Sequence, residues 1–262
     1  MKKINIKKII LQLKHALKVF LGINIYFYLK KNYFLLFKTR LNLNKNLIYY
    51  IHIGKTGGTL LKSIFLNKKN NIYSLSEDTK LYELDTNQKY IVSIRDPISR
   101  FISAFYSRRN KSEIYSKQFF SIEAIGFYLY KNANNLAEDL YSKNILKTIL
   151  SHISMRCIPT LNENIFYWFD IQDLKKNPPS FIFENSSFIE DWKIFSEKFG
   201  FHKQEIFNNV DKENRTIGKE EYLSEKAKEN LKRYYKKDIK IYNYCLKLKK
   251  SLEFLNLRLC CC

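Results

Sequence analysis

The apolar and polar positions of the chain form blocks that predict a strand, a tight turn and a helix in direct succession. Residues 48–53 are mostly Ile and Tyr, which favour a strand, and apolar residues recur at helical spacing from Leu60 to Phe65. The turn between them, Gly54-Lys-Thr-Gly-Gly-Thr59, is rich in glycine and interrupts both patterns. The N-terminus of a helix therefore directly follows a buried strand.

Strand-like and helical blocks continue to alternate along the rest of the chain. Strands are predicted at 71–75, 90–94, 165–169 and 180–183, and helices from Pro97, over 117–131, 135–151, 187–199 and 219–249. This alternation predicts an α/β fold, with a P-loop-like central parallel β-sheet flanked by helices on both faces. We divide the chain into an N-terminal extension (1–46), a main domain (47–249) and a C-terminal tail (250–262).

The N-terminal extension is basic and amphipathic. Residues 1–47 hold eleven Lys or Arg and no acid, and apolar residues from Ile6 to Leu21 follow the i, i+3, i+4 pattern of a helix. The longest uncharged stretch, 19–29, is too short to span a bilayer, and no signal-peptide cleavage site is apparent. A cytoplasmic location is expected. The helix either packs on the main domain or lies peripherally in a membrane interface, with its lysines at anionic headgroups.

The composition narrows the classes of partner. The formal net charge is 46 − 25 = +21, and no acid precedes Glu77. An anionic membrane, nucleic acid or an anionic substrate would each suit this charge, as would a simple solvated basic surface. No nucleic-acid recognition module is visible, so we expect no nucleic-acid partner.

The five cysteines are not spaced like a metal site. Cys157 and Cys245 stand alone, and Cys260 to Cys262 end the chain as either a lipidation site or exposed thiols. We therefore expect no metal.

The glycine-rich turn has the chemistry of an anion cradle. The first N–H groups of a helix lack intrahelical acceptors, and the helix dipole adds positive potential there. Gly57 and Gly58 let a phosphate approach the backbone closely, Lys55 adds a positive charge, and Thr56 and Thr59 add hydroxyl donors.

The turn differs from the loop of nucleoside-triphosphate enzymes. In the pattern GxxxxGK[ST] the first glycine would fall at position 49, where this chain has Tyr49. The glycines follow Lys55 instead of preceding it, so the loop suits a smaller group than a triphosphate. A P-loop-type kinase is therefore a disfavoured alternative.

A second candidate anion site begins at Arg95, directly after the strand predicted at 90–94. Ligands of doubly wound sheets bind at the carboxyl ends of the strands. Ser103 follows about two helical turns later and could join Arg95 on one anion. The alternative is that Arg95 and Asp96 form only a local ion pair and helix cap.

The two motifs together resemble those of carbohydrate-type sulfotransferases. HIGKTGGTL (His52–Leu60) is similar to their HIPKTGGTSL signature, and VSIRDPISRFISAFY (Val92–Tyr106) is similar to RDPxxRxxSxYxxxR, with Arg109 near its end. The C-terminal third also resembles the family, at Phe183-Glu184 and Asp191-Trp192. The resemblance covers roughly residues 47–245 and makes the main domain a sulfotransferase domain. It departs at Gly54, where the family has proline.

The resemblance implies a donor, a site and an acceptor. The donor would be 3′-phosphoadenosine 5′-phosphosulfate (PAPS), and the acceptor a carbohydrate hydroxyl, on an anionic glycan if the positive charge serves recognition. Arg95 and Ser103 would bind the 3′-phosphate. The 5′-phosphosulfate would be held by Lys55, Thr56, Gly57, Gly58, Thr59 and Leu60.

The acceptor hydroxyl needs a general base, since it loses its proton as it attacks. The family places a His or Glu near the end of the strand after the first motif, but no His lies between Leu60 and Arg95. Glu77 and Asp78, after the strand predicted at 71–75, are the candidates. His52 is interpreted as a packing residue of the strand. A non-enzymatic basic module would explain the charge but not the ordered pair of motifs.

Overall fold

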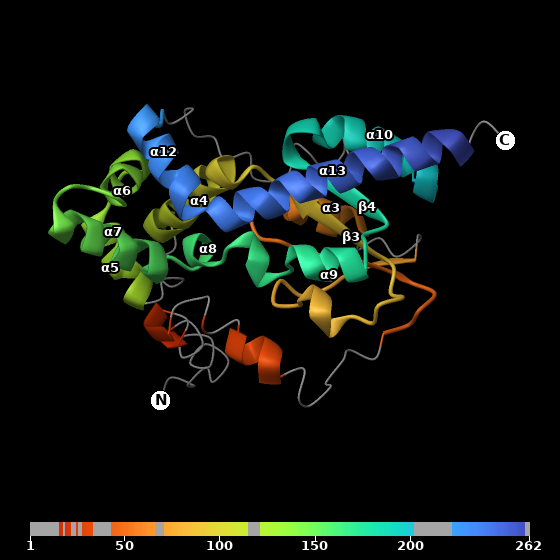
Figure 1. Cartoon of the computed structure of the whole chain (residues 1–262), viewed down its shortest axis with the longest axis horizontal. Coiled ribbons are helices and arrows are strands. Elements are labelled where there is room, and N and C mark those ends of the chain that lie inside the picture. The colour runs from red at the N-terminus through yellow and green to blue at the C-terminus, as the bar shows by residue number, and fades with distance from the viewer. Residues whose placement is uncertain are drawn as a thin grey trace.

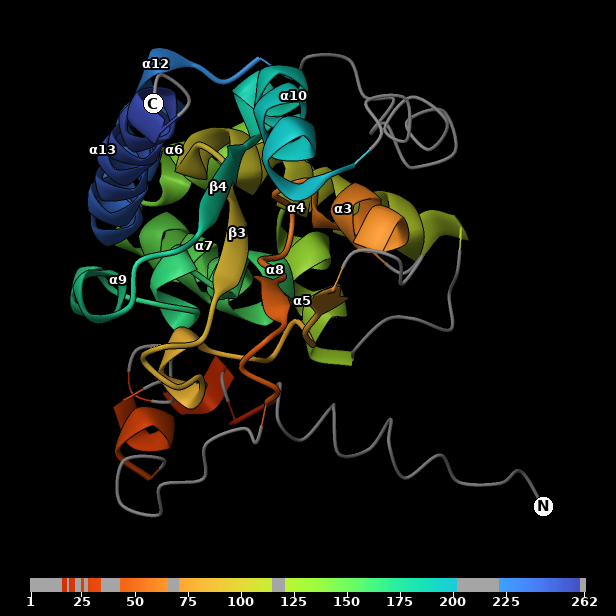
Figure 2. The same ribbon diagram turned by 90° about the vertical axis from the view of Figure 1, so that its right-hand side faces the viewer.

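The computed structural model describes residues 16–17, 19–21, 25, 28–33, 43–65, 71–114, 121–201 and 222–259. Its centre is a four-stranded sheet in the order β2-β1-β3-β4, in which every pair of neighbours is parallel. Figures 1 and 2 show the sheet inside a shell of helices. The strands are β1 (Ile48–Ile51), β2 (Ile72–Ser74), β3 (Tyr90–Ile94) and β4 (Phe181–Glu184).

The order of the strands creates a switch point between β1 and β3. From β1 the chain passes through α3 (Gly58–Phe65) to β2 on one side, and it then returns to β3 on the other side of β1. Because all four strands are parallel, their carboxyl ends lie at one edge of the sheet. Such a switch point is where open α/β sheets bind ligands.

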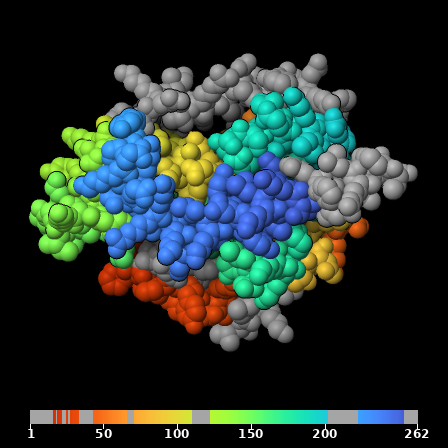
Figure 3. Space-filling view, turned by 45° about the horizontal axis from the view of Figure 1, so that its top comes forward, coloured from red at the N-terminus to blue at the C-terminus, as the bar shows by residue number. Residues whose placement is uncertain are grey.

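Helices cover both faces of the sheet, as predicted. Side chains alternate along a strand, so Tyr50 faces one side, against α3 and α10 (Phe188–Phe199), while its neighbours Tyr49 and Ile51 face the other. That second side packs on α13 (Lys236–Leu259) and on the segment from η2 (Ile165–Tyr167) to α9 (Ile171–Lys176). In Figure 3, α13 crosses the molecule between α10 and α9.

A separate hydrophobic core joins the remaining helices at one end of the molecule (Figure 1). Its buried side chains, such as Phe105 and Leu136, include no residue of the sheet. The helices are α4 (Pro97–Ile114), α5 (Ser121–Leu129), α6 (Ala133–Asp139), α7 (Ile145–Cys157), α8 (Pro159–Asn162) and α12 (Glu225–Tyr234).

One predicted strand is wrong. Residues 165–169 form the short 3-10 helix η2 and its continuation, because the carboxylate of Asp238 accepts a hydrogen bond from the Ile165 N–H at 2.9 Å. Ile165, Tyr167, Trp168 and Phe169 are all buried, so the run is apolar without being a strand. An apolar run of this length does not by itself distinguish the two structures.

Two predicted helices are each divided. The block 135–151 corresponds to α6 and α7, which are separated where the Asn144 side chain accepts from the N–H groups of Leu146 and Lys147. The block 219–249 contains α12 and α13, and α13 continues to Leu259. The three-segment division of the chain stays a prediction.

Part of the N-terminal extension contacts the main domain. Residues 28–33 are helical, and the Lys31 ammonium lies 3.2 Å from Asp170 Oδ2 and 3.1 Å from Asp173 Oδ1 on α9. Phe20 and Tyr28 are exposed. Most of the helix predicted from Ile6 to Leu21 lies outside the described residues. Among those described, no helix is long and apolar enough to cross a membrane.

The buried carboxyl group of Asp238 makes stability depend on pH. Burial raises its pKa to about 6, despite the opposing Ile165 N–H and Arg100. The unfolded chain loses this proton near pH 4, whereas the folded chain keeps it to about pH 6. The contribution of Asp238 to the free energy of unfolding therefore falls by about 3 kcal/mol as pH rises from about 4 to above 6.

We expect Asp238→Asn to remove this pH dependence. In urea unfolding at pH 4, 5, 6 and 7, the free energy of unfolding of the variant should rise relative to that of the wild type by about 3 kcal/mol over that range. Glu229→Gln, at an exposed carboxylate on α12, should show no such gain. Parallel curves for wild type and Asp238→Asn would contradict the assignment.

Candidate active site

The carboxyl ends of all four strands contribute polar residues to one edge of the sheet. The turn 54–57 follows β1, and Arg95 with Asp96 follows β3. Glu77 and Asp78 lie a few residues beyond β2, and Glu184 ends β4. Lys55, Arg95 and Glu77 therefore lie at the same edge of the sheet because parallel strands end together.

The turn after β1 has an unusual backbone. Lys55 has a φ of 72° and Gly57 a φ of 90°, both in the left-handed region. This conformation is common for glycine but costs energy for lysine, and such backbone outliers concentrate at functional sites. Here it reverses the chain directly into α3, whose first N–H groups face the carboxyl edge of the sheet.

Gly58 is required where α3 begins. A Cβ atom at this position would collide with the imidazole ring of His52 and lie 2.6 Å from the Tyr50 hydroxyl. His52 is buried and stacks on Tyr50 with ring centroids 5.9 Å apart. Burial lowers the pKa of His52, Glu77 opposes this effect and Lys62 adds to it, so the imidazole is neutral at neutral pH. The ring therefore fills the space beside the first residue of α3.

A buried chain of three hydroxyl groups lies beneath the turn. Tyr50 Oη is 2.5 Å from Ser93 Oγ, and Ser93 Oγ is 2.6 Å from Thr56 Oγ1. Thr56 donates its proton to the Ile53 carbonyl at 2.8 Å, so Ser93 donates to Thr56 and Tyr50 donates to Ser93. Burial raises the pKa of Tyr50, which keeps it a neutral donor. The chain ties β1, the turn and β3 together.

Thr56 consequently has its hydroxyl proton engaged inside the protein. Its side chain is fully buried, and only its backbone N–H is left to face a ligand. Ser93 was missed by the sequence analysis, although a lone serine within the apolar strand Tyr90–Ile94 is a visible signal.

Arg95 spans from β3 to the turn. Its Nη1 lies 3.5 Å from the Lys55 carbonyl, and its Nε is buried without an acceptor among the described residues. Burial lowers the pKa of Arg95, against the attraction of Asp96, and the group remains charged. Asp96 forms the helix cap that the alternative interpretation named, since it accepts from the Ser99 N–H at 2.8 Å. Arg95 thus presents an unused donor at the carboxyl edge of the sheet.

Two further residues of the second motif lie on α4. Ser103 is largely buried. Arg100, which the sequence analysis did not single out, donates to the Gly54 carbonyl at 2.9 Å and to the Glu163 carbonyl at 2.7 Å. Its guanidinium also lies over the Trp168 ring, 5.5 Å from the centroid. Arg100 therefore fixes the first residue of the turn against α4.

The two candidate bases have different surroundings. Glu77 Oε1 lies 3.1 Å from His52 Nδ1, a buried atom without a hydrogen bond among the described residues, and the Glu77 side chain is 65% exposed. Asp78 accepts a hydrogen bond from the Tyr167 hydroxyl at 3.3 Å. Trp168 Nε1 donates to the Glu77 carbonyl at 2.8 Å. Tyr167 and Trp168 belong to the wrongly predicted strand, so their support of this loop was missed.

The end of β4 is held by α10 and α13. Glu184 accepts from Ser186 at 2.6 Å and from Tyr242 at 2.8 Å. Burial alone would raise the pKa of Glu184, but these hydrogen bonds lower it overall. Lys249 Nζ lies 2.6 Å from Asp191 Oδ1, and Asp191 in turn accepts from the Glu184 N–H at 2.6 Å. The end of β4 is therefore fixed, and its carboxylates have hydrogen-bond or ion-pair partners within the protein.

The geometry is that of an anion site without a metal cluster in the part of the chain described. A model described as the sulfotransferase family matches residues 41–245. The chain belongs to the sulfotransferase family. The match covers the whole sheet, both motifs and most of the helices. The searches of curated proteins and of solved structures gave no significant match.

Family membership confirms part of the sequence-based interpretation. The protein is a transferase that uses a sulfate donor, for which PAPS is the general expectation in sulfotransferases. The roles of individual residues and the nature of the acceptor stay predictions.

Gly58 gives a direct test of the packing in this sulfotransferase. Gly58→Ala should destabilise the fold by about 1–3 kcal/mol, because the new methyl group displaces His52. Gly54→Ala is the matched control, since a Cβ there meets nothing within 4 Å. Urea unfolding of both variants measures the difference. Equal midpoints would show that His52 yields without cost.

Proposed function

We propose that this sulfotransferase transfers a sulfuryl group from PAPS to a hydroxyl of a carbohydrate acceptor. One observation carries the proposal: the turn after β1 and the Arg95 guanidinium after β3 meet at the switch point of the sheet. Arg95 has a buried Nε without an acceptor among the described residues. Two groups suited to anions, on adjacent strands, fit a donor that carries two separate phosphates.

The donor would lie across these two groups. Lys55, the glycines of the turn and the first residues of α3, Thr59 and Leu60, would hold the 5′-phosphosulfate. Thr56 would contribute its backbone N–H, because its hydroxyl proton goes to the Ile53 carbonyl. Arg95 and Ser103 would hold the 3′-phosphate. The absence of side chains at Gly57 and Gly58 leaves the backbone open to a close approach by phosphate.

The chemistry of the transfer matches this arrangement. The acceptor oxygen attacks sulfur, and the bond between sulfur and the bridging phosphate oxygen breaks in line with it. Negative charge then grows on the phosphate oxygen that leaves. The Lys55 ammonium and the α3 N–H groups would stabilise that charge more in the transition state than in the ground state.

We propose Glu77 as the general base that takes the acceptor proton. Its carboxylate is exposed, so an acceptor can reach it, and it lies against His52, which borders the start of α3. The hydrogen bond from Trp168 fixes the backbone of Glu77. Asp78 remains the alternative base, although its Oδ1 is already hydrogen-bonded to Tyr167.

The acceptor class rests on the resemblance to carbohydrate-type enzymes, and the charge of +21 supports an anionic glycan. A peripheral membrane contact of the N-terminal extension is supported by its exposed Phe20 and Tyr28 and its excess of lysine. The cytoplasmic location stays a prediction.

Binding of the donor product tests the proposed site. Adenosine 3′,5′-bisphosphate at a hundred times its dissociation constant should stabilise the protein by about 2.7 kcal/mol, and ATP should stabilise it less. Thermal unfolding with each nucleotide measures this. A larger response to ATP, or no response to the bisphosphate, would overturn the proposal.

Lys55→Ala should abolish most turnover from PAPS, because losing a group that stabilises the leaving oxygen costs about 3–4 kcal/mol of barrier. Lys89→Ala is the matched control, because this exposed lysine directly precedes β3 at the opposite edge of the sheet, and the variant should keep its turnover. Similar rates for the two variants would refute the role of Lys55.

The choice of base is tested by exchanging each carboxylate for its amide. Glu77→Gln should lower kcat by about a hundredfold or more while the response to the bisphosphate persists. Asp78→Asn should have a smaller effect. The reverse order of effects would assign the base to Asp78, and full activity of both variants would exclude both residues.

A further inference from the structure

Six large apolar side chains are exposed on α5 and α7, outside the site described above. Their exposed fractions range from 40% for Ile153 to 84% for Tyr128. We call this surface the α5–α7 face. Its members are Ile125, Tyr128, Ile145, Leu146, Ile149 and Ile153.

The two helices run antiparallel, so these side chains share one side. Ser154 Oγ donates to the Gly126 carbonyl at 2.6 Å, and directly after α5 the Tyr130 hydroxyl oxygen lies 3.2 Å from the Lys147 carbonyl oxygen. A Cβ at Gly126 would lie 2.9 Å from the Ile158 side chain, so the glycine allows the helices to pack closely. Gly126 and Ser154 mark the sides on which the two helices meet. Counted from these residues at the period of a helix, the exposed apolar residues of α5 and of α7 lie on the same side of the pair.

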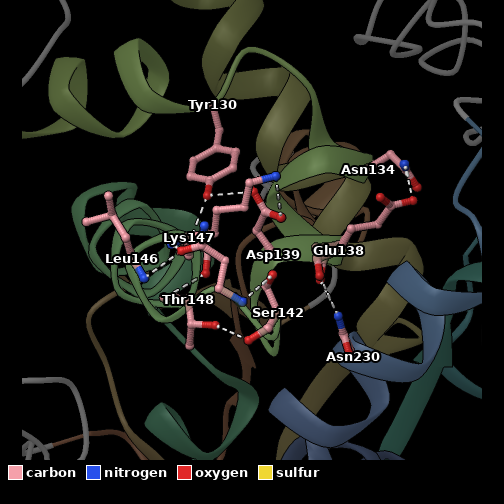
Figure 4. Close-up of polar contacts among 12 residues, drawn as sticks. Tyr130, Asn134, Glu138, Asp139, Ser142, Leu146, Lys147, Thr148 and Asn230 are labelled. Atoms are coloured by element: carbon pink, nitrogen blue, oxygen red, sulfur yellow. Dashed lines mark hydrogen bonds and ion pairs between the residues drawn. The ribbon is translucent and has the colours of Figure 1, made fainter.

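The α5–α7 face is presented by a rigid support. Figure 4 shows Leu146 pointing away from a network of polar contacts at the start of α7. In that network Thr148 Oγ1 donates to the Ser142 carbonyl at 3.1 Å, and Tyr130 donates to Asp139 at 3.0 Å. Asn230 of α12 donates to the Glu138 carbonyl at 2.9 Å. These contacts hold the start of α7 against the loop before it, and α6 against α12.

Basic residues lie at both ends of the α5–α7 face, and on α7 itself the exposed Lys147 lies 3.9 Å from Asp139. The sequence of α7 contains no acid, and the only acid of α5, Glu123, is buried and paired with Arg108. Exposed Lys131 follows α5 and exposed Lys143 precedes α7, so both lie at one end of the antiparallel pair, while exposed Arg156 lies at the other.

We propose that the α5–α7 face docks on an anionic lipid membrane. Apolar side chains surrounded by lysine and arginine suit the boundary between acyl chains and anionic headgroups, where a tyrosine such as Tyr128 is also favoured. A second copy of the chain fits less well, because each copy carries a charge of +21 and the same basic rim. The face would hold the enzyme at the bilayer independently of what is sulfated.

Sedimentation with vesicles tests this proposal on the full chain. Vesicles with 30% phosphatidylserine in phosphatidylcholine should bind the wild type, and pure phosphatidylcholine should bind it much less. The pair Leu146→Asp and Ile149→Asp should weaken binding by at least about tenfold. The matched control, Ile189→Asp with Ile194→Asp, changes two exposed isoleucines of α10 and should leave binding unchanged.

A charge-reversal pair separates loss of docking from loss of folding. Lys131→Glu with Lys143→Glu leaves the apolar side chains untouched and should weaken binding to the anionic vesicles by roughly fivefold or more per lysine. The proposal is overturned if the wild type does not bind, or if the α5–α7 variants bind like the α10 control. It is also overturned if their only effect is to abolish self-association in sedimentation velocity.

Discussion

The chain of hydroxyl groups from Tyr50 through Ser93 to Thr56 is the interaction on which the site depends. It lies between the two strands that flank the switch point and ends at the Ile53 carbonyl, directly below the turn. Each hydroxyl has one proton, so the direction of all three hydrogen bonds is fixed once Thr56 donates to the backbone. Buried polar groups that satisfy one another in this way impose one arrangement on their surroundings. The left-handed conformation of Lys55 is thereby supported from beneath.

The charged side chains at the carboxyl edge of the sheet fall into two sets. One set has its hydrogen-bond and ion-pair partners within the protein, and the other, among the described residues, does not. Arg100, Glu184 and Asp191 direct their charges to other parts of the chain and hold the edge in shape. The Arg95 Nε and the Glu77 carboxylate are different: the first is buried without an acceptor among the described residues, and the second is mostly exposed beside His52. In the proposed transfer, the Arg95 guanidinium would bind the anionic donor and the Glu77 carboxylate would take the proton of the acceptor hydroxyl.

Local patterns predicted much of the fold. β1, β3 and the start of α3 follow from alternation, glycine placement and helical spacing within a few residues, and the convergence of Lys55, Arg95 and Glu77 follows from parallel strands. The segment Ile165–Phe169 was not predictable in this way, since its conformation depends on Asp238, more than seventy residues later in the chain. For the same reason Tyr167 and Trp168 could not be recognised as supports of Glu77. Arg100 was recognised only as part of a motif, because its partners are backbone carbonyls, which have no sequence signature.

The clamp that α13 places on the end of β4 has a consequence for biosynthesis. All four strands lie before residue 185 in the sequence, whereas Tyr242 and Lys249 follow β4 by more than fifty residues. A nascent chain can therefore pair its four strands before Tyr242 and Lys249 are present to hold the end of β4. A premature stop before residue 242 would therefore remove these contacts while leaving both sequence signatures intact.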